Sequence, residues 1–220
     1  MTSAVKPVSG PLLLRLACTA ATIFAVHLAI VAGAIHLAVA VLFGALAAVP
    51  ASTALRSGGL RRLGFGALSL ALLGVALGAF FWSGASDRAA LVLPPFLGYM
   101  ATSGFFGYSL LPGQEPVIVR MSHVTQGPEL PPGLEDYARA LTWGWALLPA
   151  LLAFIALAVL YFAGLEAWSW ATNVVNPVIL VGFFIGEHFY RAWRMPHIDK
   201  PSILRTLDIM MNSSAWRRSS

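Results

Sequence analysis

Charged residues are scarce in this chain of 220 residues, and cysteine is nearly absent. Charged side chains make up 10% of the sequence and hydrophobic ones 58%, whereas an ordinary soluble domain holds about 25% charged and about 45–50% apolar residues. The mean hydropathy of +0.77 agrees with this bias. The composition excludes a soluble globular enzyme, a disordered regulator and a nucleic-acid-binding module. It predicts an all-α integral membrane protein that has no nucleic acid as a partner.

Recognisable catalytic patterns are also missing. The sequence has no His-Glu-x-x-His zinc motif, no phosphate-binding Gly-x-x-x-x-Gly-Lys loop and no Gly-x-Ser-x-Gly elbow. The single cysteine, Cys18, lies in an apolar run and has no second cysteine with which to form a disulfide or bind a metal ion. We therefore expect no metal ion and no cofactor, and we assign no catalytic residue.

Long apolar runs are what the sequence has in abundance. A membrane-crossing helix needs about 20 mainly apolar residues. The apolar block 12–49 would be about 55 Å long as one helix, nearly twice the hydrocarbon thickness, so we expect two short spans with a tight turn near Gly33; one broken helix is the alternative. Residues 1–220 thus form one polytopic domain, a compact bundle of about six helices. The predicted spans are 12–30, 34–50, 63–82, 89–110, 140–163 and 169–190.

The polar stretches between these spans give the predicted connections. Residues 51–62 are expected to be a loop, and Leu165–Trp168 a short turn between the last two spans. Residues 111–139 are expected to form a long cytoplasmic loop, and residues 191–220 a cytoplasmic tail.

Basic residues are unevenly divided between the two sides that six spans define. Of the 14 lysines and arginines, only Arg88 falls on the side opposite the termini. The positive-inside rule then predicts that both termini are cytoplasmic. Trp82 and Trp168 would lie at the outer interface, and Trp143 and Trp193 at the inner one.

Few polar residues lie inside the predicted spans, and polar groups are expensive there, so each is a functional candidate. These intramembrane candidates are His27, His36, Asn173, Asn176 and Glu187. The two histidines approach each other only if their segments form a hairpin. Asn173 and Asn176 are three residues apart, so they share a helix face, and Pro177 is expected to kink the helix beside them.

Glu187 and Arg191 form an i,i+4 pair with the acid first, which is the favourable order. Either the pair neutralises itself near the interface, or the acid exchanges protons. Further candidates lie in and around the long loop; they are Arg120, Pro131, Pro132, Tyr137, Arg139 and Arg191.

The long loop has two interpretations: a rigid connector, or a docking surface for a cytoplasmic enzyme or carrier protein. Residues 118–123 are expected to form a short amphipathic helix on the inner membrane surface. In the tail, Arg217 and Arg218 are expected to meet anionic headgroups.

The loop and the last span also carry a resemblance. The motifs are Glu115-Pro-Val-Ile-Val-Arg120, Pro128-x-Leu-Pro-Pro132, Tyr137, Thr142-x-Gly-Trp145 and Gly186-Glu-His-x-x-Arg191. They resemble a group of uncharacterised bacterial inner-membrane proteins encoded in aryl polyene and related fatty-acid-type biosynthesis clusters. Some members are labelled "ketosynthase" by neighbourhood, but this chain has no nucleophilic cysteine with histidine partners.

Three functions remain open at this point. The resemblance and the docking-like loop imply a non-catalytic accessory protein that supports assembly or membrane handling of a polyene or acyl lipid. Its partners would be membrane lipids and cytoplasmic biosynthetic enzymes, or an acyl carrier protein bound through residues 111–139. The alternative is a small lipid transporter or flippase, and the third is a membrane-embedded lipid-modifying enzyme.

Overall fold

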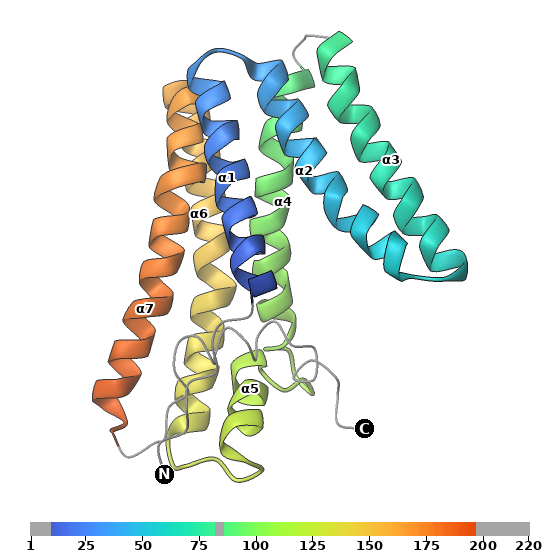
Figure 1. Ribbon diagram of the computed structural model, residues 1–220. Coiled ribbons are helices and arrows are strands. Elements are labelled where there is room, and N and C mark those ends of the chain that lie inside the picture. The colour runs from blue at the N-terminus through green and yellow to red at the C-terminus, as the bar shows by residue number, and fades with distance from the viewer. Residues whose placement is uncertain (1–9, 82–85, 197–220) are drawn as a thin grey trace. The chain divides into compact units, whose positions relative to one another are not determined.

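The computed structural model describes residues 10–81 and 86–196, which are almost entirely helical (Figure 1). The helices are α1 (Gly10–Val31), α2 (Ile35–Arg56), α3 (Gly59–Phe81), α4 (Ser86–Tyr108), α5 (Val117–Gln126), α6 (Leu134–Trp170) and α7 (Asn176–Arg194), with a π-helical turn, Ala171–Val175, between α6 and α7. No strand occurs in this described part of the chain. The all-α fold class is therefore confirmed.

The helices have the length and composition that a bilayer requires. Among the described residues, α2, α3, α4 and the continuous run Leu134–Arg194 are each long and apolar enough to cross a membrane. The last of these has 61 residues, about 90 Å of helix at 1.5 Å per residue, and therefore has to reverse direction to remain in a bilayer about 30 Å thick. The chain is a transmembrane protein; the count of six crossings stays a prediction.

The chain divides into two compact units, which we describe separately. Unit 1 comprises Met1–Pro95 and Ala158–Val174, and unit 2 comprises Phe96–Leu157 and Val175–Ser220.

The turn between α1 and α2 in unit 1 is built around Gly33, as the sequence predicts. Gly33 has φ 73°, a left-handed conformation that glycine adopts without strain. Its N–H donates to the Ile30 carbonyl at 3.0 Å, and the Ala34 N–H donates to the Ala29 carbonyl at 2.8 Å. This is the hydrogen-bond pattern of a Schellman motif, so residues 12–50 belong to two helices rather than to one broken helix.

The predicted loop 51–62 is wrong, because α2 continues to Arg56 and α3 begins at Gly59. Alanine, leucine and arginine are good helix formers, so the helices extend past the point at which the apolar run ends. Ser69 of α3 also donates to the Ala47 carbonyl of α2 at 3.1 Å, which holds the two helices together.

The chain reversal within the run Leu134–Arg194 occurs at one residue. Gly164 has φ 85° and ψ −177°, a combination that only glycine adopts readily. The predicted turn at Leu165–Trp168 is therefore wrong: these residues are helical, and Gly164 reverses the chain before them. Trp168 is 3% exposed, so protein covers its ring, and its position at the outer interface stays a prediction. Trp82 falls outside the described residues.

In unit 2, α6 and α7 pair antiparallel in a register centred on Gly164. The Asn176 side chain donates to the Leu152 carbonyl at 3.4 Å, and both residues lie twelve positions from Gly164. Trp145 and Phe183, each nineteen positions away, have ring centroids 5.3 Å apart. The short reversal therefore determines which residues of the two helices meet.

The segment 111–139, predicted as a loop, contains α5 and the first turns of α6. The helix predicted at 118–123 is confirmed and is longer, Val117–Gln126. Its apolar side does not face a membrane surface, because Val117 and Met121 pack on Phe106 of α4 and Ala146 of α6. Helix α5 is thus a cap on the ends of α4 and α6 within unit 2 (Figure 1).

Gly164→Ala is expected to destabilise the fold by about 1–3 kcal/mol, because an added Cβ strains this backbone conformation. The matched control is Gly44→Ala in the interior of α2, where a Cβ meets nothing within 4 Å. There alanine is expected to be neutral or to stabilise by up to about 1 kcal/mol. Thermal unfolding in detergent, followed by circular dichroism, measures both, and equal losses would contradict the role of Gly164.

Candidate functional site

Three of the residues singled out in the sequence meet where the first turns of α6 face the last turns of α7. The Tyr137 hydroxyl donates to Glu187 Oε1 at 3.1 Å, and Arg191 Nε lies 3.2 Å from the same oxygen. The side chains of Glu187 and Arg191 are 9% and 18% exposed. The Glu187 carboxylate is thus largely removed from solvent and held by a cation and a phenol, and we name these three residues the Tyr-Glu-Arg cluster.

Aromatic and apolar side chains surround the cluster. Tyr190 stacks on Tyr137 with ring centroids 6.0 Å apart. Met195, just after α7, packs with Leu134 at the start of α6. This packing excludes water from one side of the ion pair and lowers the local dielectric, which strengthens the attraction between the two charges.

The geometry of the Tyr-Glu-Arg cluster favours pairing over proton exchange, the other role proposed for Glu187. Both Tyr137 and Arg191 converge on one oxygen of the carboxylate. Arg191 Nε is buried and lies at ion-pair distance without the alignment of a hydrogen bond. The cluster is therefore an electrostatic clasp between α6 and α7.

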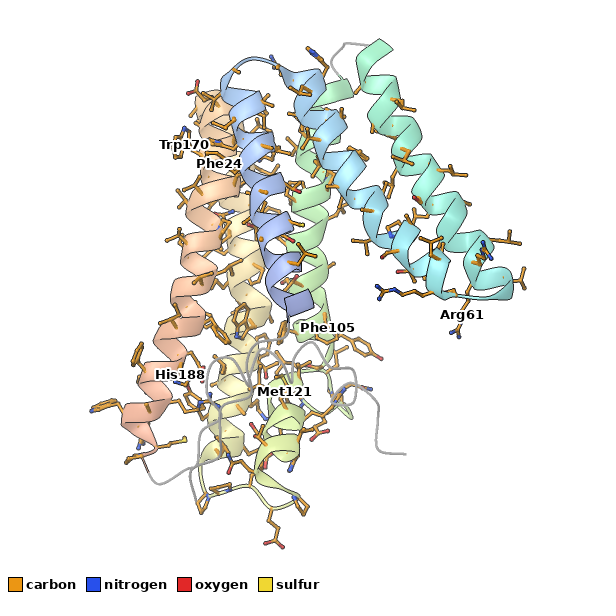
Figure 2. The ribbon with its side chains drawn as sticks, in the orientation of Figure 1. Phe24, Arg61, Phe105, Met121, Trp170 and His188 are labelled. Carbon is orange, nitrogen blue, oxygen red and sulfur yellow. The ribbon has the colours of Figure 1, made fainter. Side chains whose placement is uncertain are left out.

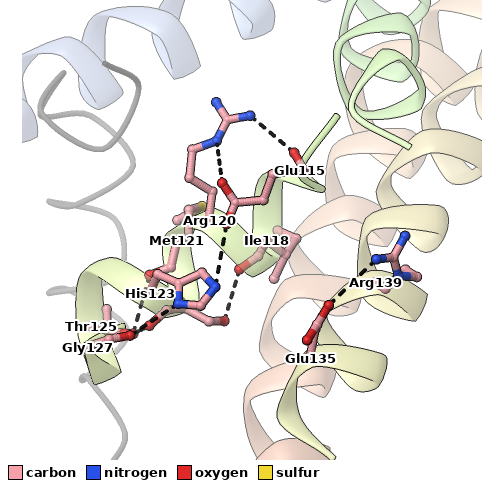
Figure 3. A network of polar contacts seen from close by, with 10 residues as sticks. Glu115, Ile118, Arg120, Met121, His123, Thr125, Gly127, Glu135 and Arg139 are labelled. Atoms are coloured by element: carbon pink, nitrogen blue, oxygen red, sulfur yellow. Dashed lines mark hydrogen bonds and ion pairs between the residues drawn. The ribbon is translucent and has the colours of Figure 1, made fainter. Parts of the chain in front are cut away.

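A second polar network lies on α5 and the residues before it (Figure 3). The Glu115 carboxylate is 3.5 Å from both Arg120 Nε and His123 Nε2. Arg120 also donates to the Glu115 carbonyl at 3.1 Å, and His123 Nδ1 is 3.2 Å from the Gly127 carbonyl. Because one carboxylate bridges both basic side chains, the charged edge of α5 is fixed from its beginning to its end.

The remaining loop candidates have local structural roles. Arg139 lies 3.6 Å from Glu135, one turn earlier in α6, and both side chains are exposed. The Pro131 carbonyl accepts the Leu134 N–H at 3.1 Å in the turn that leads into α6. Pro132 is exposed on that turn.

The N-terminus of α5 is capped by two hydroxyls from outside the helix, those of Ser109 just after α4 and of Thr142 in α6, a feature that sequence reasoning missed. The Val117 N–H donates to the Ser109 hydroxyl at 3.1 Å. The Ile118 N–H donates to the Thr142 hydroxyl of α6 at 3.4 Å. These N–H groups have no partner within their own helix, so the two hydroxyls fasten α5 in place. The only local signal was serine and threonine near helix ends, which is too common to be diagnostic.

Two intramembrane candidates of unit 1, His27 and Asn173, are joined through Ser169 by hydrogen bonds. Asn173 donates to the Ser169 hydroxyl at 2.9 Å, and that hydroxyl is 2.9 Å from Nδ1 of the buried His27. The Trp170 ring packs edge-on against the imidazole, with centroids 4.5 Å apart. His36, at the start of α2, is exposed. The two histidines thus lie on neighbouring helices as predicted, and His27 bonds Ser169.

The segment before Pro177, where the sequence predicts a kink, is the π-helical turn Ala171–Val175. Proline has no N–H to donate to a carbonyl of the preceding turn, and the widened turn accommodates the missing hydrogen bond. The Thr172 hydroxyl in it is buried without a partner. In unit 2 the Asn176 amide is buried and reaches α6, so the two asparagines bond different partners.

No metal or catalytic constellation emerges from these contacts. Among the described residues, no group of three or more His, Cys, Asp or Glu side chains is gathered to hold a metal ion. Comparisons with protein families, with curated proteins and with solved structures each find no match.

Glu187→Gln is expected to destabilise the protein by about 3 kcal/mol, because it leaves the half-buried Arg191 without its counter-charge. Tyr137→Phe removes one hydrogen bond and is expected to cost about 1 kcal/mol. The matched control is Glu135→Gln, which breaks the exposed pair with Arg139 and is expected to cost less than about 0.5 kcal/mol. Unfolding in detergent measures all three, and an equal effect at Glu135 and Glu187 would contradict the clasp.

Ser169→Ala is expected to destabilise unit 1 by about 1–3 kcal/mol, because it removes the hydrogen-bond partner of the buried His27 and of the half-buried Asn173. Ser52→Ala is the control, since the Ser52 hydroxyl bonds only the Val49 carbonyl of its own helix. The protection of α1 amides from hydrogen exchange reports the loss locally. Unchanged protection in Ser169→Ala would refute a structural role for the chain of hydrogen bonds.

Proposed function

We propose that this chain is a non-catalytic accessory protein of a bacterial inner membrane that supports assembly or membrane handling of a polyene or acyl lipid. The observation that carries the proposal is the construction of the α5 cap. Its apolar side packs on α4 and α6, and its first two N–H groups donate to Ser109 and Thr142. Such a fixed surface outside the spans is suited to docking rather than to crossing the bilayer.

The exposed side of this cap has the character of a protein-docking surface. Val124 is 53% exposed, and Glu115, Glu129, Glu135 and Arg139 are also exposed in residues 111–139 of unit 2. Interfaces combine an apolar centre with a polar rim. The resemblance noted in the sequence supports cytoplasmic biosynthetic enzymes or an acyl carrier protein as the partner.

Site-specific photocrosslinking tests this proposal. A photoreactive residue at Val124 is expected to crosslink an acyl carrier protein or a biosynthetic enzyme of the host. The same residue at Val178 of α7, which is 66% exposed within an apolar span, is the control and is expected to crosslink no such protein. In a deletion strain the lipid product should be lost or mislocalised. Equal crosslinking at both positions, or unchanged lipid, would overturn the proposal.

The alternative function, a lipid transporter or flippase, is favoured by one observation. The Thr172 hydroxyl is buried without a partner in a π-helical turn, and π-helical turns occur frequently at functional sites. Movement of a labelled lipid in reconstituted vesicles, and its loss in Thr172→Val, would support transport over the accessory role. Inactivity of the wild-type protein would exclude it.

A further inference from the structure

The turn between α2 and α3 concentrates positive charge that the described chain does not neutralise. Residues 1–86 contain no aspartate or glutamate. Arg56 is the last residue of α2, and Arg61 and Arg62 lie in the first turn of α3. All three are exposed, and Figure 2 shows Arg61 at the turn. Among the described residues none of the three forms an ion pair.

Exposed leucines alternate with these arginines. Leu55, Leu60 and Leu63 are 80%, 87% and 69% exposed. A contiguous group of such leucines is unfavourable in water. We name residues 55–63 the Arg-Leu turn. Its mixture of apolar and cationic side chains suits the boundary between acyl chains and headgroups, where arginine stems remain in the apolar layer and guanidinium groups reach outward.

The backbone reinforces the preference for an anion on one side of the turn. The first N–H groups of α3 have no partner within the helix, and the helix N-terminus carries partial positive charge. Arg61 and Arg62 add full charges at this end. Arg56 lies at the C-terminus of α2, where a cation balances the opposite partial charge.

We propose that the Arg-Leu turn binds the phosphate of an anionic phospholipid. Arg61 and Arg62 contact the phosphate, Arg56 adds to the local positive potential, and Leu55, Leu60 and Leu63 contact the acyl chains. The leucines identify a lipid rather than free phosphate as the ligand, because a soluble anion would leave them in water. The proposal does not depend on the α5 cap or on the accessory function.

Native mass spectrometry of the full-length protein tests the proposal, with phosphatidylglycerol and phosphatidylcholine of matched acyl chains added in equal amounts. Each exposed cation near a headgroup favours an anionic lipid by about fivefold. We expect the wild-type protein to retain about tenfold or more phosphatidylglycerol than phosphatidylcholine. The triple substitution R56Q/R61Q/R62Q should abolish the preference, whereas R56K/R61K/R62K should keep most of it.

One control and one substitute variant make the result specific. Arg88→Gln removes one exposed arginine outside the Arg-Leu turn and should leave the preference unchanged. If the triple glutamine variant loses its helical circular dichroism, the single substitution Arg61→Gln tests the proposal instead. It is expected to lower the preference for phosphatidylglycerol by about fivefold. Equal retention of both lipids by the wild-type protein, an unchanged preference in the glutamine variants, or displacement of the lipid by excess inorganic phosphate would each overturn the proposal.

Discussion

The reversal of the chain at Gly164 is the constraint on which the candidate site depends. Because α6 and α7 pair at nearly equal distances from this residue, the short reversal determines which side chains face one another. A shift of one residue in either helix would rotate its side chains by about 100°. Tyr137 on α6 would then no longer meet Glu187 on α7, although neither lies near the reversal. The clasp is therefore a consequence of backbone geometry more than twenty residues away in sequence.

The bilayer imposes a second constraint, and the polar groups of both units illustrate it. Hydrocarbon offers no hydrogen bonds, so the protein must supply them itself. In unit 1 this requirement joins His27 to Ser169 and Asn173. In unit 2 it joins Asn176 to the Leu152 carbonyl. These residues connect helices, and their rarity in the sequence reflects the cost of each one rather than a concentration of chemistry.

The length of apolar runs made the helices, and the turn at Gly33, predictable from the sequence. Other features depend on distances between helices, which no local pattern contains. The sequence identifies Tyr137, Glu187 and Arg191 as candidates, but it places them in three different segments: the loop, the end of the last span and the start of the tail. Only the register around Gly164 brings them together. Likewise, the amphipathic pattern of α5 predicts an apolar side that faces the membrane surface, whereas the structure covers that side with α4 and α6.

Charge divides the surfaces outside the apolar helices into two kinds, whatever the placement of the units. The α2–α3 turn carries three arginines without an acid, whereas the stretch 115–139 carries four acids, of which two pair with its two arginines, Arg120 and Arg139. Anionic headgroups attract the first surface and repel exposed acids of the second. In the proposed arrangement, the stretch around α5 stays in water, where a protein partner can reach it. A membrane protein with both kinds of surface can hold lipid at one and a soluble partner at the other, which is what an accessory role in lipid assembly requires.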